Sequence, residues 1–99
     1  MNVAELRATL ASSAPPKGLS PPLIALWWEA KGDWTKAHEL AQEDEGPQGA
    51  WVHAYLHRKE GDDSNAAYWY GRAGKAPFQG PFDRSFDDEW NAIVSALLG

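Results

Sequence analysis

His53 and His57 are four positions apart in the sequence. On a helix this spacing places both imidazoles on one face, where they could share a metal ion with Glu60 or Asp62 as an oxygen ligand. The spacing secures no third ligand, and Ala54 stands where a metalloprotease motif needs glutamate. In the competing interpretation the two histidines make hydrogen bonds to a neighbouring helix. We therefore expect no metal and no cofactor, and keep a metal-dependent or ligand-processing role of this face as an alternative.

A larger polar and aromatic set surrounds the turn at Gly61-Asp62. If the helices on either side of that turn pack antiparallel, side chains from both approach one another. Arg58 and Arg72 could then bind an acidic group through paired hydrogen bonds, with tyrosine and tryptophan rings as flat walls. In the structural alternative the arginines pair with nearby carboxylates and Trp69 belongs to the core. The predicted ligand-binding residues are His53, His57, Arg58, Asn65, Tyr68 and Arg72.

The composition excludes several kinds of chemistry. The chain has no cysteine, which removes disulfides, thiolate metal sites and cysteine nucleophiles. Its serines lie mainly in expected loops and helix caps, and no catalytic arrangement stands out. The sequence therefore predicts no catalytic residue and favours a non-enzymatic role.

Length and charge limit the partners. Ninety-nine residues are enough for one domain, which we place at residues 1–99. The net charge of −5 argues against a nucleic-acid partner, because such proteins usually carry a basic stripe. No apolar run is long enough to cross a bilayer, and the N-terminus has no secretory signal pattern. We expect a cytoplasmic protein without a membrane partner.

The positions of these candidates depend on helices, because apolar residues recur every three to four positions and no segment shows strand alternation. Capping residues and glycines mark the ends of the helices. Six helices are expected: one after Asn2, one from Pro21 to Gly32, one from Asp33 to the acidic run 43–45, one over about 48–60, one from Asp62 or Ser64 to Gly74, and one from Ser85 onward. Residues 12–22 and 75–84 are expected to be loops. On the third helix, Trp34, Ala37, His38 and Ala41 form a regular stripe.

A short internal repeat groups these helices into hairpins. The Gly32-Asp33 turn recurs 29 positions later as Gly61-Asp62. At the same offset, alanines 25 and 37 match alanines 54 and 66, and Thr35 matches Ser64. Small residues at fixed places let the two backbones of a hairpin approach closely, as in stacked helical repeats.

Residues 26–41 and 55–73 resemble short tetratricopeptide or Sel1-like repeats, on the Glu60-Gly61-Asp62 turn and on Ala66, Tyr70 and Ala73. The stretch 57–70 also resembles a family of small helical proteins with no assigned activity. The resemblance implies an all-α array of antiparallel helix hairpins, tetratricopeptide-like, with about six helices. Its expected role is a binding or interaction module with a protein or peptide partner. A structural homo-oligomer is a further alternative.

Overall fold

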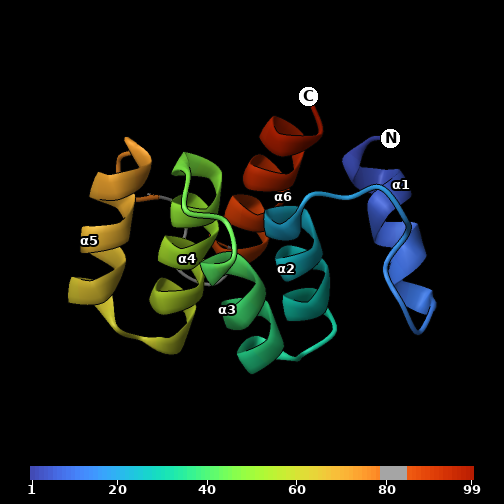
Figure 1. The fold of residues 1–99 in the computed structure, drawn as a ribbon, viewed down its shortest axis with the longest axis horizontal. Helices are drawn as coiled ribbons and strands as arrows, with labels where there is room; N and C mark the ends of the chain where they lie inside the picture. The colour runs from blue at the N-terminus through green and yellow to red at the C-terminus, as the bar shows by residue number, and fades with distance from the viewer. Residues whose placement is uncertain (79–84) are drawn as a thin grey trace.

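The protein is all-α in the computed structural model, which describes residues 1–78 and 85–99 (Figure 1). The helices are α1 (Val3–Ala8), α2 (Pro21–Ala30), α3 (Trp34–Gln42), α4 (Pro47–Glu60), α5 (Asp63–Ala73) and α6 (Ser85–Leu98), and a 3₁₀ turn, η1 (Thr9–Ala11), follows α1. An all-α fold of about six helices is therefore confirmed. Residues 79–84 of the expected second loop lie outside the described residues. None of the helices in the described chain is both long and apolar enough to cross a membrane.

At two turns the helices end and begin where the Gly-Asp pairs predict. Gly32 and Gly61 adopt φ values of +91° and +90°, a left-handed conformation that glycine reaches without strain. The next residue in each case caps the following helix: Asp33 accepts a hydrogen bond from the backbone of Lys36, and Asp62 accepts one from the backbone of Asn65. Two tight helix–helix turns therefore follow from two Gly-Asp pairs.

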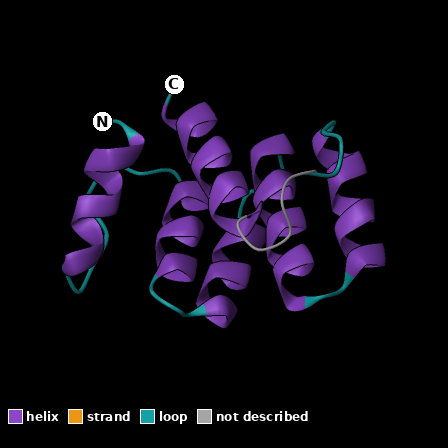
Figure 2. Cartoon of the chain, turned by 180° about the vertical axis from the view of Figure 1, so that it is seen from behind, coloured by secondary structure: helices purple, strands orange, loops and turns teal. Residues whose placement is uncertain are grey.

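Helices α2, α3, α4 and α5 lie side by side in chain order, with α2/α3 and α4/α5 as the closest pairs (Figure 1). Seen from behind, α6 crosses the middle of this row (Figure 2). It contacts α1, α2 and α4, so the last helix covers the back of the array.

One main core lies between this row and α6. Its largest fully buried side chains include Trp27, Trp90 and Tyr55. The indole nitrogen of Trp90 donates a hydrogen bond of 2.9 Å to the backbone oxygen of Leu26. The four alanines at the 29-residue offset are all buried, at 0 to 3% exposure: Ala25, Ala37, Ala54 and Ala66.

Helix α4 is the central element, with α2, α3, α5 and α6 packed around it. Its buried residues therefore extend around most of the helix instead of forming one stripe. His53 and His57 are among them, at 4% and 7% exposure. The fold thus buries the two histidines that the sequence singles out.

Candidate functional site

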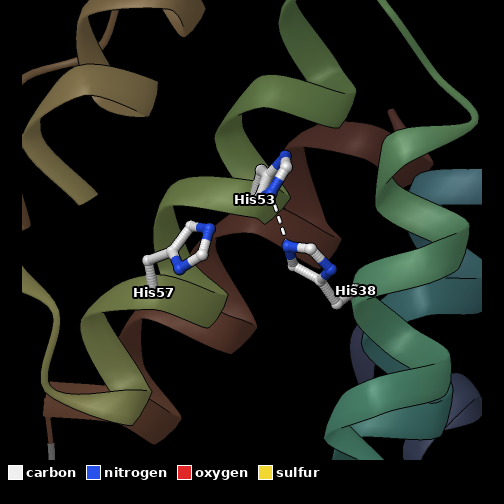
Figure 3. Close-up of side chains that lie close together, drawn as sticks. All are labelled: His38, His53 and His57. Atoms are coloured by element: carbon white, nitrogen blue, oxygen red, sulfur yellow. Dashed lines mark hydrogen bonds between the residues drawn. The ribbon is translucent and has the colours of Figure 1, made fainter. Parts of the chain in front are cut away.

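All three histidines of the chain meet in one cluster. His53 and His57 come from α4, and His38 comes from the facing side of α3 (Figure 3). The Nε2 atoms of His38 and His53 are 2.8 Å apart, a hydrogen bond in which one ring donates to the other. A cluster that the sequence predicts from two histidines therefore contains a third.

Two of the three rings are stacked, and the third is nearly perpendicular to them. His53 and His57 stack with centroids 4.8 Å apart and planes 19° apart. The ring of His38 is nearly perpendicular to both, at 82° to His53 and 77° to His57. This arrangement brings ring nitrogens, rather than carbon faces, from α3 and α4 together (Figure 3).

Two tryptophans hold the cluster from either side. Trp34 stacks on His38 with centroids 4.9 Å apart, and Trp69 of α5 stacks on His53 at 3.9 Å. The indole nitrogen of Trp34 donates a 2.9 Å hydrogen bond to the backbone oxygen of Leu56. Because Trp34 is attached to α4 in this way, the ring of His38 has a fixed wall behind it.

Glu60 orients the third imidazole. Its Oε1 lies 2.6 Å from the Nδ1 of His57. In the tautomer that donates this hydrogen bond, the Nε2 of His57 keeps a free lone pair. Figure 3 shows this second nitrogen on the side of the ring that faces His38 and His53.

Burial keeps two of the rings neutral. The pKa of His53 is lowered to about 4, first by removal from water and then by the neighbouring imidazoles of His38 and His57. Burial also lowers the pKa of His38, with a smaller contribution from His57. Both rings therefore carry a nitrogen lone pair near neutral pH, which is the state that binds a metal or accepts a proton.

Two groups of side chains in the described residues have ligand atoms close enough to hold a metal ion. His38, His53 and His57 form one, and His57, Glu60 and Asp62 form the other, each with ligand atoms within 4.8 Å of one another. In the second group, the Oδ1 of Asp62 already accepts a hydrogen bond from Ser64 and caps α5. The three-histidine group is the better candidate because its nitrogens are not needed to hold a helix end.

A groove of about 560 Å³ adjoins this cluster. Its floor is Ala50 and His53 of α4, one rim is Trp69 and Arg72 of α5, and the opposite rim is formed by the end of α3 and the connection to α4. The residues on that opposite rim are Ala41, Gln42, Asp44, Glu45 and Gly46. His53 is thus shared between the histidine cluster and the groove.

Of the other predicted site residues, three lie on α5 and Arg58 lies on α4, against α6. Tyr68 and Arg72 lie together on α5, where the tyrosine hydroxyl is 3.1 Å from the guanidinium, and Tyr68 is 55% exposed. Asn65 lies in the first turn of α5, where its backbone N–H bonds to Asp62.

Arg58 points elsewhere. Its guanidinium lies 3.1 Å from the carboxylate of Glu89 on α6 and 4.4 Å from the centroid of the Phe86 ring. Arg58 is therefore part of the packing of α6, while Arg72 lines the groove.

His38 is the residue that the sequence reasoning missed as a site residue. It stands on the apolar stripe of α3, four positions after Trp34, and that regularity favoured a core role. The only signal in the sequence was a histidine on the apolar stripe of the helix that precedes the one carrying His53 and His57.

Comparison with models of protein families, with curated proteins and with solved structures gave no significant match.

Proposed function

We propose that this chain is a helical binding module that holds a peptide segment in the groove between the α3–α4 connection and α5. The observation that carries the proposal is the groove itself, whose volume of about 560 Å³ is in the range of ligand pockets. The resemblance to tetratricopeptide and Sel1-like repeats agrees with this role, since stacked helix hairpins commonly bind through an extended face.

The two rims carry opposite charges. Arg72 is exposed on α5, and Asp44 and Glu45 are on the facing rim. Between them, Trp69 provides a half-buried aromatic surface. A peptide with an acidic side chain near a basic one matches both rims, and its amide groups suit a lining of mixed polarity.

A large exposed apolar patch on Trp27, Trp28 or Phe78 would favour either an interaction module that binds through that patch or a homo-oligomer. Trp27 is fully buried, and the other two are half-buried in the described structure. The groove has the stronger support.

Titration of ¹⁵N-labelled protein with a blocked peptide of alternating glutamate and lysine tests the proposal. We expect chemical-shift changes at the Trp69 indole and at backbone amides 42–46 and 72. Arg72→Ala should weaken binding about 10-fold or more, because hydrogen bonds to a charged partner contribute roughly 1.5–3 kcal/mol.

Lys17→Ala is the matched control. Lys17 is an exposed cation on the loop before α2 and does not line the groove, so its loss should leave the affinity unchanged. Equal affinities of Arg72→Ala and the parent protein, or shifts confined to other surfaces, would refute the groove as the binding site.

A further inference from the structure

We infer that His38, His53 and His57 together form a binding site for one divalent transition-metal ion, and that zinc fits it best. This site lies beside the proposed peptide groove, and its existence does not depend on peptide binding. The convergence of every histidine in the chain on one point, from two helices, is the central observation.

The ligand set fits zinc. Three imidazole nitrogens with a fourth position left open form a well-known type of zinc site, and imidazole also suits copper and nickel. In a tetrahedral site with Zn–N bonds of about 2.0–2.1 Å, two ligating nitrogens are separated by about 3.3 Å. The nitrogens here include one pair at 2.8 Å, and all lie within 4.8 Å of one another.

To accept an ion, nitrogens up to 4.8 Å apart must approach one another by as much as about 1.5 Å, and the stacked rings of His53 and His57 must rotate so that both lone pairs point at it. The Nε2 atoms of His38 and His53 must separate by about 0.5 Å to reach tetrahedral spacing. In the hydrogen bond between these atoms one of the two rings carries its hydrogen on Nε2. That ring must change to the tautomer with the hydrogen on Nδ1 before its Nε2 can bind the ion. His38 is only half-buried and sits at an edge of the cluster, so its side chain can make this adjustment.

One of the three rings, that of His57, already has an outer partner of the kind found around metal-bound histidines. Such a histidine typically donates its other ring N–H to a carboxylate, which fixes the tautomer and the ring orientation. Glu60 accepts this hydrogen bond from the Nδ1 of His57 at 2.6 Å. Trp34 and Trp69 hold the rings of His38 and His53 by stacking, which reduces the cost of ordering the ligands.

The local electrostatics also favour a cation. The carboxylates of Glu39 and Glu60 are close enough to His38 to act on it electrostatically. The chain as a whole carries a net charge of −5. Binding therefore places positive charge near negative charge.

Calorimetric titration of the metal-free protein with zinc chloride at pH 7.5 measures the affinity and the stoichiometry. We expect one ion per chain. At a free zinc concentration a hundred times the Kd, the melting temperature should rise by on the order of 10 °C. Cobalt(II) should bind at the same ratio and give the strong visible absorption of a four-coordinate site.

His38→Gln is the decisive variant because His38 is the least buried of the three and its loss leaves α4 intact. It should weaken zinc binding by about 100-fold or more, since even loss of an outer partner commonly costs 10–100-fold. Glu60→Gln changes such an outer partner and should weaken zinc binding by about 10–100-fold. Glu43→Gln, an exposed carboxylate at the end of α3, is the control and should bind as the parent does.

Nitrogen-15 NMR of the imidazoles in the parent protein supplies a readout that needs no variant to fold. One equivalent of zinc should shift the ring nitrogens of His38, His53 and His57 together. Absence of stoichiometric binding, shifts at fewer than three rings, or unchanged affinity in a folded His38→Gln protein would each overturn the site. Arg72→Ala should bind zinc normally, so failure of the peptide groove and failure of the metal site are distinguishable.

Discussion

Burying a histidine changes the balance between its charged and neutral forms, and His53 shows this most clearly. The side chain is 4% exposed and stacks between the rings of Trp69 and His57. Its pKa falls from the ordinary 6.5 to about 4, because burial and the adjacent imidazoles both disfavour a positive charge. Near neutral pH the folded protein therefore holds this ring uncharged.

The lowered pKa predicts how stability depends on pH. Between pH 6.5 and about 4 the unfolded chain binds a proton at His53 that the folded chain does not. The free energy of unfolding should therefore fall as the pH falls through this window, by about 1–3 kcal/mol from this residue. Urea unfolding of the metal-free protein at several pH values measures the slope.

His53→Gln provides the comparison for this prediction. The buried carboxyl of Glu89, whose pKa is raised chiefly by burial, has the opposite pH dependence, and it is present in both proteins. The difference between the two curves therefore isolates the histidine. Parallel curves between pH 4 and 6.5 would contradict the assignment.

Sequence reasoning found two of the three imidazoles at this site. The spacing of His53 and His57 is visible within one helix, because the geometry of a single helix fixes which side chains share a face. His38 is on another helix, and its proximity to His53 depends on how α3 packs against α4. The Trp69 contact and the Arg58–Glu89 pair likewise depend on packing, so the sequence alone does not reveal them.

At the scale of single elements, the predictions from sequence were more complete. Helix ends are decided by local backbone groups that need hydrogen-bond partners, and the residues that supply them are neighbours in sequence. Asn2 and Glu5 form a reciprocal cap at the start of α1. The short 3₁₀ turn after α1 was not predicted, since apolar spacing does not distinguish it from a continued helix.

Three glycines should respond differently to alanine because their surroundings differ. Gly61 has a φ of +90° and open space at its Cβ position, so Gly61→Ala should destabilise by about 1 kcal/mol through backbone strain alone. Gly71 lies within α5 with open space around it, so Gly71→Ala should stabilise by about 0.5–1 kcal/mol. Thermal unfolding of each variant measures the difference.

Gly49→Ala should be the most damaging of the three. A Cβ at Gly49 would lie 2.1 Å from the backbone oxygen of Asp44, so the α3–α4 connection would have to move. We expect a loss of more than about 2 kcal/mol, in the range of severe packing errors. A Gly49→Ala protein as stable as Gly61→Ala would show that this close approach is not maintained in solution.

At the scale of the whole molecule, α6 connects helices that are distant in sequence. The carboxylate of Glu89, 1% exposed, bonds to Arg58 of α4 and to the hydroxyl of Tyr70 of α5. A similar set joins Glu29 of α2 to Tyr55 and Lys59 of α4. In both sets a buried carboxylate has a tyrosine and a cation as partners, which compensates for its removal from water.

Removal of the Glu89 carboxylate should therefore lower the free energy of unfolding of the whole fold. Glu89→Ala leaves a half-buried arginine and a buried tyrosine without this carboxylate, and a loss of about 3–5 kcal/mol is expected. The exposed neighbouring residue offers the control, since Asp88→Ala should change stability by less than about 0.5 kcal/mol. Chemical denaturation compares the two, and equal stabilities would contradict the role given to Glu89.

The position of α6 in the chain has a consequence for the order of events during synthesis. The hairpins α2/α3 and α4/α5 close over short loops, so they can form soon after their residues leave the ribosome. The Trp90 contact with Leu26 spans 64 positions and must wait for the last helix. Until then the apolar backs of α2 and α4 face solvent, so the nascent chain passes through a stage in which it is most vulnerable to aggregation. That stage ends when residues 85–99 emerge and α6 packs against the row.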